Sequence, residues 1–171
     1  EPYGLLKSTD AGRTWTPIAG LQYKSFAPLP LVRLADRSIV GVSRWAVKYD
    51  REEGAFIGMT YHFDPDASRY TTTENLILGL PPGMGRLTFD RHIFALPDGA
   101  LLVAVYGSAT KLPGESNSTG RRALLLRSED RGLTWRYFST LGPRPEPSVV
   151  RFSATEMMSL LRVNGWMPLE Q

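Results

Sequence analysis

An octapeptide pattern that occurs twice places the strongest constraint on how this chain can fold. The pattern S-x-D-x-G-x-T-W occupies residues 8–15 and again residues 128–135, each time after a short apolar run. Serine and aspartate side chains hydrogen-bond the backbone amides of a tight turn, and glycine adopts the positive φ that such a turn often requires. The tryptophan then begins the returning strand and buries a large ring against the sheet. Each copy therefore predicts a β-hairpin.

Three further strand–turn–strand segments recur, at residues 31–40, 93–102 and 149–158. From Leu34 to Leu96 is 62 residues, and from Leu96 to Phe152 is 56. The two octapeptides are 120 residues apart, which leaves room for one skipped copy near residues 63–70, where a turn lacks the glycine and the Thr-Trp pair. The repeating unit is thus four short strands, two successive hairpins, which is typical of a β-propeller blade.

The predicted fold is all-β, with blades of four antiparallel strands in one partial propeller that spans residues 1–171. The expected units are a half blade at 1–24, blades at 26–80 and 88–141, and a half blade at 146–165. The total is about three blades, whereas closed propellers have four to eight. We therefore expect a fragment of a longer chain or, alternatively, a homodimer in which two copies close one ring.

Composition excludes several other classes of protein. Of the 171 residues, 42% are hydrophobic and 22% charged, which suits a domain with a real core. The net charge of +3 comes from scattered basic residues, so we expect no nucleic-acid partner. The sequence has no cysteine, two histidines and no apolar run of about 20 residues. We therefore predict no metal, no cofactor and no membrane span.

The octapeptide resembles the Asp box, or bacterial neuraminidase repeat, of the sialidase superfamily of β-propellers. That resemblance implies a six-bladed propeller and a retaining exo-glycosidase that acts on sialic acid or related glycans. It also implies that the boxes are structural and lie on the face away from the substrate, so that Asp10 and Asp130 are not catalytic. The composition leaves the cellular location open, and the resemblance implies a secreted or periplasmic protein.

Propeller geometry predicts where a site would lie. The start of each innermost strand and the end of the next strand share one face, together with the longest loops. Counting along the repeat assigns Asp90 and Tyr106 to one such pair of positions and Arg44 to the matching strand end one blade earlier. We expect these residues, with the neighbouring His92, to contact a glycan, although a packed strand histidine is an alternative reading of His92.

The last blade carries the pair Glu146 and Arg162, which are sixteen residues apart. In sialidases a similar Glu-x-x-x-Val stretch is followed by an arginine at this spacing. By that resemblance Glu146 would take the proton from a nucleophilic tyrosine, and Arg162 would be one of three arginines that clamp the substrate carboxylate. The alternative is a carboxylate at a strand start and an arginine that faces solvent.

The chain also departs from the sialidase pattern. Ala27 stands where the family has the first arginine of its clamp, and residues 1–7 contain only Glu1 as a carboxylate. The third arginine and the tyrosine would follow Gln171. We therefore expect part of an exo-glycosidase that lacks most catalytic residues by itself. The alternative is a non-catalytic propeller that binds glycans or proteins.

Overall fold

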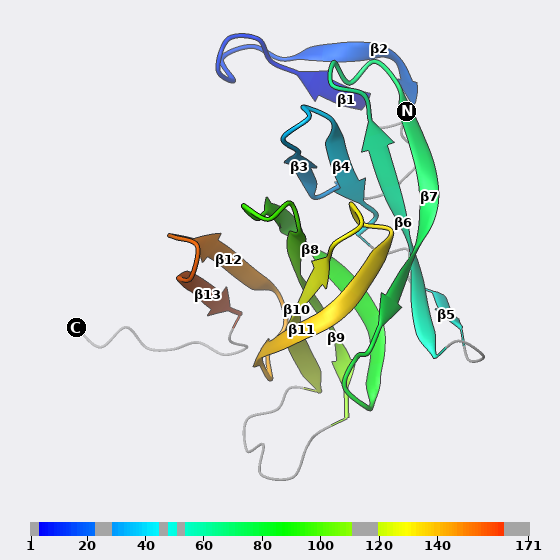
Figure 1. The fold of residues 1–171 in the computed structure, drawn as a ribbon, viewed down its shortest axis with the longest axis vertical. Helices are drawn as coiled ribbons and strands as arrows, with labels where there is room; N and C mark the ends of the chain where they lie inside the picture. The colour runs from blue at the N-terminus through cyan, green and yellow to red at the C-terminus, as the bar shows by residue number, and fades with distance from the viewer. Residues whose placement is uncertain (1–3, 23–28, 45–47, 51–53, 111–119, 163–171) are drawn as a thin grey trace.

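The computed structural model describes residues 4–22, 29–44, 48–50, 54–110 and 120–162 (Figure 1). The predicted residue Ala27 and the outer limits of the two terminal half blades lie outside these ranges. The described residues form strands and turns and contain no helix, so the all-β prediction is confirmed. The strands are β1 (Gly4–Lys7), β2 (Thr16–Gln22), β3 (Leu31–Arg33), β4 (Ile39–Val42), β5 (Lys48–Asp50), β6 (Ala55–Phe63), β7 (Tyr70–Leu78), β8 (Met84–Ala95), β9 (Leu101–Ala109), β10 (Arg121–Ser128), β11 (Thr134–Gly142), β12 (Pro147–Arg151) and β13 (Met157–Leu161).

Two antiparallel meanders make up the main sheet. The first meander consists of β3, β4, β6 and β7 in that order, with the short β5 also paired to β6. The second meander consists of β8, β9, β10 and β11. A parallel pairing of Thr134–Arg136 in β11 with Leu76–Leu78 in β7 joins them into one mixed sheet. β1 with β2, and β12 with β13, form separate two-stranded sheets.

The eight-stranded path nearly closes on itself as a barrel. Its two end strands, β3 and β8, lie beside each other, and the amide of Phe89 donates to the carbonyl of Arg44 at 3.1 Å. A core cluster of large apolar side chains fills the space between the meanders, and Phe89 meets Trp135 there edge to face at 6.0 Å. The two meanders therefore share one hydrophobic core. The finer prediction, that each meander is a propeller blade, remains a prediction.

β9 and β10 are buried on both faces. One face of each strand belongs to the shared core, while Ala104 and Leu125 on the other face pack against Val149 of β12. A strand that is buried on both faces has no side that faces solvent, so its sequence does not alternate between apolar and polar residues. This position explains the unbroken apolar runs at residues 101–105 and 123–126.

The three predicted strand–turn–strand segments form hairpins with the same closing hydrogen bond. In each turn, an amide donates to a carbonyl four residues later: Leu34 to Ser38 and Leu96 to Ala100, both at 2.8 Å, and Phe152 to Glu156 at 2.9 Å. Residues 63–70 form the predicted turn between β6 and β7, closed by Asp64 and Arg69. β8 begins at Met84, four residues before the predicted start of the blade at 88, and Met84 pairs with Ala109 at the end of β9.

Both octapeptides, named Asp boxes below for their resemblance to that motif, form the predicted hydrogen-bond network. In the second box, Ser128 Oγ accepts from the amide of Gly132 and donates to Asp130 Oδ1, both at 2.8 Å, and Asp130 Oδ1 accepts from the amide of Thr134 at 2.8 Å. The first box repeats these bonds with Ser8, Asp10, Gly12 and Thr14. The two glycines have φ of 85° and 88°. The carboxylates are thus occupied within their own turns.

The two box tryptophans have different surroundings. The Trp135 side chain is fully buried, and its box lies against the first meander, where Gly132 meets Val40 and Thr60. Trp15 is 58% exposed and folds back on its own turn, with Nε1 donating to the Gly12 carbonyl at 3.0 Å. The prediction that both rings are buried is therefore wrong for Trp15, because no described element lies where the first meander lies for Trp135.

Candidate functional site

A β-bulge in β8 displaces three polar residues from the regular ladder. Phe89 pairs with Val105 and Ile93 pairs with Val103, so residues 90–92 lie opposite a single residue of β9. A bulge of this kind bends its strand and re-aims the side chains that it contains. The displaced residues are Asp90, Arg91 and His92. The strand β12 packs beside β8. The bulge therefore directs charged groups toward β12.

These residues line a cavity of about 280 Å³, named here the bulge cavity. Its walls come from the segment after β4, from the β8 bulge and from the start of β12. Four of the six predicted site residues meet in it, although they are far apart in the sequence. The full lining is Arg44, Asp90, Arg91, His92, Glu146, Pro147 and Ser148.

Asp90 is the most buried charged group of the bulge cavity, with 8% of its surface exposed. Burial raises the pKa of its carboxyl above the ordinary value. The amide of Arg91 and the charges of His92 and Arg44 act in the opposite direction but do not cancel the effect of burial. A carboxyl with a raised pKa is suited to donating a proton or a hydrogen bond at the edge of a cavity.

Glu146 and Arg162 form an ion pair at the open end of the β12–β13 hairpin. Pro147 lies opposite Leu161, so the residues that flank this pair of strands face each other. Arg162 Nη1 donates to Glu146 Oε1 at 2.7 Å, and both side chains are about half exposed. The spacing of sixteen residues is thus explained by the hairpin geometry, and it places a guanidinium next to the bulge cavity through Glu146.

Tyr106 does not line the bulge cavity. The repeat alignment placed it opposite Asp90, but in the sheet it pairs with Thr88, because the bulge shifts the register of β8 by two residues. Sequence reasoning also missed Arg91 and Ser148, which line the cavity. Arg91 lies between two residues that were predicted, whereas nothing in the sequence marks Ser148.

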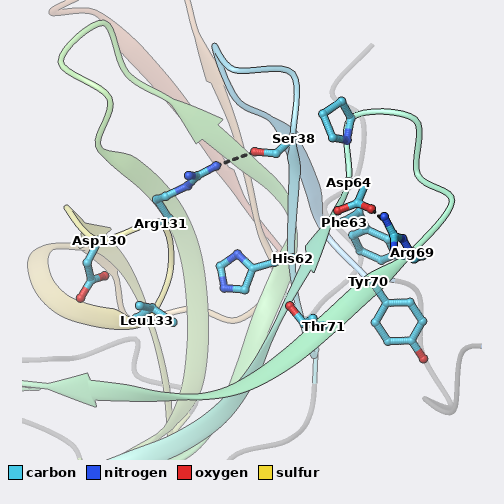
Figure 2. Close-up of a pocket in the computed structure, with 11 residues that line it drawn as sticks. Ser38, His62, Phe63, Asp64, Arg69, Tyr70, Thr71, Asp130, Arg131 and Leu133 are labelled. Carbon is cyan, nitrogen blue, oxygen red and sulfur yellow. Dashed lines mark hydrogen bonds and ion pairs between the residues drawn. The ribbon is translucent and has the colours of Figure 1, made fainter.

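A larger cavity of about 650 Å³ lies on the Asp-box side of the two meanders (Figure 2). None of the six predicted site residues lines it. Two of its charged groups, Arg69 and Asp64, pair with each other at 3.2 Å, and Arg131 pairs at 2.7 Å with Asp36, which lies outside the lining. Burial, with a smaller effect from Arg131, lowers the pKa of His62 at its centre. This cavity is the larger of the two, but the bulge cavity is the one in which four of the predicted site residues meet.

The bulge cavity offers a mixed set of charged groups. Guanidinium groups bind carboxylates through paired hydrogen bonds, and carboxylates accept hydrogen bonds from sugar hydroxyls. In the part of the chain that the structure describes, no group of three or more His, Asp or Glu side chains could hold a metal ion. Nor do the described residues include a helix long and apolar enough to cross a membrane.

Comparison with known proteins adds no assignment. A scan against protein-family models and a search of curated proteins each found no match to this chain.

Proposed function

We propose that the chain is part of a sialidase-like β-propeller that binds an acidic glycan in the bulge cavity. The observation that carries this proposal is the meeting of Arg44, Asp90, His92 and Glu146 around one cavity. Three segments of the chain converge there, and two of them belong to β8 and β12, which are innermost strands in the propeller interpretation. Binding sites in propellers are built where such strand ends and their loops meet.

The strand order supports the propeller part of the proposal. Each meander consists of four antiparallel strands in sequence order, as a blade does. The first strands of successive units are also neighbours, since β3 lies beside β8 and β8 lies beside β12. Strands that occupy the centre of a propeller have this relation to one another. The Asp boxes, in turn, close the third and fourth strands of their units.

The cavity's charges support an acidic sugar as the ligand. Arg44 and Arg91 can bind a carboxylate, and Arg162 can join them if a ligand displaces it from Glu146. Asp90, whose pKa is raised by burial, can donate to a hydroxyl or ring oxygen when it is protonated. A neutral sugar offers the guanidinium groups no charged group to bind.

The test is isothermal titration calorimetry, in which the chain is titrated with sialic acid and, separately, with its methyl ester. We expect the acid to bind and the ester, which lacks the charge, to bind at least about tenfold more weakly. Arg44→Ala should weaken binding of the acid by a similar factor. Arg69→Ala is the matched control, because Arg69 is an exposed arginine paired with Asp64 away from the bulge cavity.

Equal affinity for the acid and the ester would contradict the proposed class of ligand. Equal losses in Arg44→Ala and Arg69→Ala would instead contradict the location. Both outcomes can be read from the same set of titrations.

A catalytic role for the complete protein rests on Glu146 and Arg162. In that role Glu146 would take a proton from a nucleophilic tyrosine, and Arg162 would hold the substrate carboxylate; the residues that line this cavity do not include a tyrosine. In an active complete protein, Glu146→Gln and Arg162→Ala should each lower the hydrolysis of a chromogenic sialoside by orders of magnitude. Near-normal hydrolysis by both variants would remove this assignment.

The second candidate function is a propeller that binds glycans without hydrolysing them. It is favoured by the direct ion pair between Glu146 and Arg162, which occupies both groups with each other. In that case the two variants would change glycan affinity, and the unaltered complete protein would release no sugar from the sialoside.

A further inference from the structure

We infer that the bulge cavity takes an anionic ligand together with one proton, and that Asp90 is the residue that holds this proton. The inference rests on the proposed function, because it concerns the same cavity and the same class of ligand. Two guanidinium groups line the cavity, those of Arg44 and Arg91, and two carboxyl groups line it as well, those of Asp90 and Glu146. When both carboxyl groups are ionised, these four charges cancel. One added proton leaves a net positive charge, which attracts a ligand that carries one negative charge.

The two carboxyl groups of the cavity differ in their surroundings. Glu146 is about half exposed and accepts a hydrogen bond from Arg162 at 2.7 Å, so its ionised form is both solvated and paired. Asp90 is buried, and burial is the largest influence on its carboxyl, whose pKa is raised. A proton that enters the cavity therefore binds Asp90 in preference to Glu146.

The charged neighbours of Asp90 come from the segment after β4, from β8 itself and from the start of β12. They are Arg44, Arg91, His92 and Glu146. The two other strands beside β8 add no charge: Ala104 of β9 lies opposite the bulge, and β3 contributes no residue to the lining. The ionisation of Asp90 is therefore governed by burial, by these four side chains and by whatever charge the ligand brings.

An anionic ligand favours the neutral form of Asp90 for two reasons. A ligand carboxylate bound by the guanidinium groups of the lining places a second negative charge in the same cavity, and a nearby like charge disfavours the ionised form of a carboxyl. The protonated carboxyl can also donate its O–H to the ligand, and hydrogen bonds from O–H to a carboxylate are short and strong. Binding of the ligand and uptake of the proton are therefore coupled.

The coupling predicts that the affinity for sialic acid falls as pH rises through the pKa of Asp90, because at higher pH the proton must first be taken up. The ligand's own carboxyl, comparable to an α-carboxyl with a pKa of about 3.5, stays ionised from pH 5 upward. We expect sialic acid to bind about tenfold more tightly at pH 5 than at pH 8. That ratio corresponds to a difference of about one unit between the pKa of Asp90 in the bound and in the free protein.

Asp90→Asn separates this role from a merely structural one. The asparagine amide can donate where the protonated carboxyl donates, but it cannot ionise. We expect this variant to bind sialic acid equally at pH 5 and pH 8, and more tightly than the unaltered chain at pH 8. Loss of a purely structural contact would instead weaken binding at both pH values. His92→Gln is the matched control and should keep the tenfold ratio, because histidine side chains in general change charge in this pH range.

Isothermal titration calorimetry at pH 5, 6 and 8, in pairs of buffers that differ in their enthalpy of ionisation, gives both the affinity and the number of protons taken up. We expect the unaltered chain to take up as much as one proton on binding, and Asp90→Asn to take up none. Equal affinity at all three pH values without proton uptake would overturn the inference and leave the acidic-glycan proposal in place. A pH dependence that persists in Asp90→Asn but is lost in His92→Gln would also overturn it. Sialic acid that bound at no pH would overturn the proposed function and this inference together.

Discussion

At the scale of single residues, the same eight-residue motif produces the same turn twice but different packing. Ser8 and Ser128 bind the corresponding glycine amides at 2.8 Å in both boxes. Hydrogen bonds from Thr14 and Ser8 lower the pKa of Asp10 to about 2. For Asp130, partial burial raises the pKa, but hydrogen bonds from Thr134 and Ser128 outweigh it, and the net pKa is lowered. Turn chemistry is local, which is why the sequence predicted it correctly.

What the sequence could not predict is whether each box tryptophan finds a neighbour. Burial of Trp135 depends on the first meander, whose residues lie far away in the chain. The motif carries no information about that distant surface. The same limit applies to Asp90, whose type is evident in the sequence but whose burial follows from β12 and the segment after β4.

Asp90 gives a prediction about pH. Because burial raises the pKa of its carboxyl in the folded state, the folded chain binds this proton more tightly than the unfolded chain. Its contribution to the free energy of unfolding therefore falls as pH rises from the ordinary value of 3.8 through the raised pKa. Asn at this position cannot ionise. We expect Asp90→Asn to gain stability relative to the unaltered protein between pH 4 and pH 7, measured by urea denaturation.

Asp66→Asn is the control, because its stability relative to the unaltered protein should change with pH in the opposite direction. Hydrogen bonds from Ser68 lower the pKa of Asp66, so its contribution to stability is present above the unfolded-state pKa and is lost as pH falls through the lowered pKa. Asp66→Asn should therefore lose stability relative to the unaltered protein as pH rises. If both variants changed with pH in the same direction, burial of Asp90 would not be the cause of its pKa shift.

At the scale of elements, the bulge in β8 decides which residues meet. Phe89 and Ile93 are both buried in the shared core, four residues apart. A regular strand would also place them on one face, because side chains alternate with a period of two. The bulge adds two residues to β8, and an even number of extra residues leaves the alternation of inward and outward side chains unchanged. The apolar pattern of the sequence therefore cannot reveal the bulge. The hairpins were predictable from their turns, whereas the register of β8 was not, and Tyr106 was misplaced for this reason.

The two meanders are also linked by a buried polar contact, which gives a second prediction. The Thr60 hydroxyl in β6 donates to the Gly132 carbonyl of the second Asp box at 2.6 Å and accepts from Asn75 Nδ2 at 2.8 Å. Thr60→Val keeps the shape but removes both bonds and leaves two buried groups without these partners. We expect a loss of about 2 to 4 kcal/mol in the free energy of unfolding.

Urea denaturation measures this loss, and Thr72→Val serves as the control. Thr72 is exposed on β7, so its replacement should change the stability by less than about 0.5 kcal/mol. Equal effects of the two substitutions would show that the contact between β6 and the second Asp box does not hold the meanders together.

At the scale of the whole molecule, the sequence repeats predicted the four-strand units but not how they are assembled. The repeat gave the order of strands within each meander, because neighbouring strands are joined by short turns. The parallel pairing of β7 with β11 and the approach of β3 to β8 join segments that are distant in sequence. The bulge cavity also lies where distant segments meet, namely the segment after β4, the β8 bulge and the start of β12. Such contacts depend on tertiary packing rather than on any local pattern.

The most direct test of the proposed function is to map, by NMR, the backbone amides that respond to sialic acid. We expect the largest chemical-shift changes at Arg44, at residues 90–92, and at Glu146 and Ser148, which surround the bulge cavity. The amides of His62, Arg69 and Thr71 around the larger cavity should not respond. Changes concentrated around that larger cavity, or no changes at millimolar ligand, would contradict the assignment of the binding site.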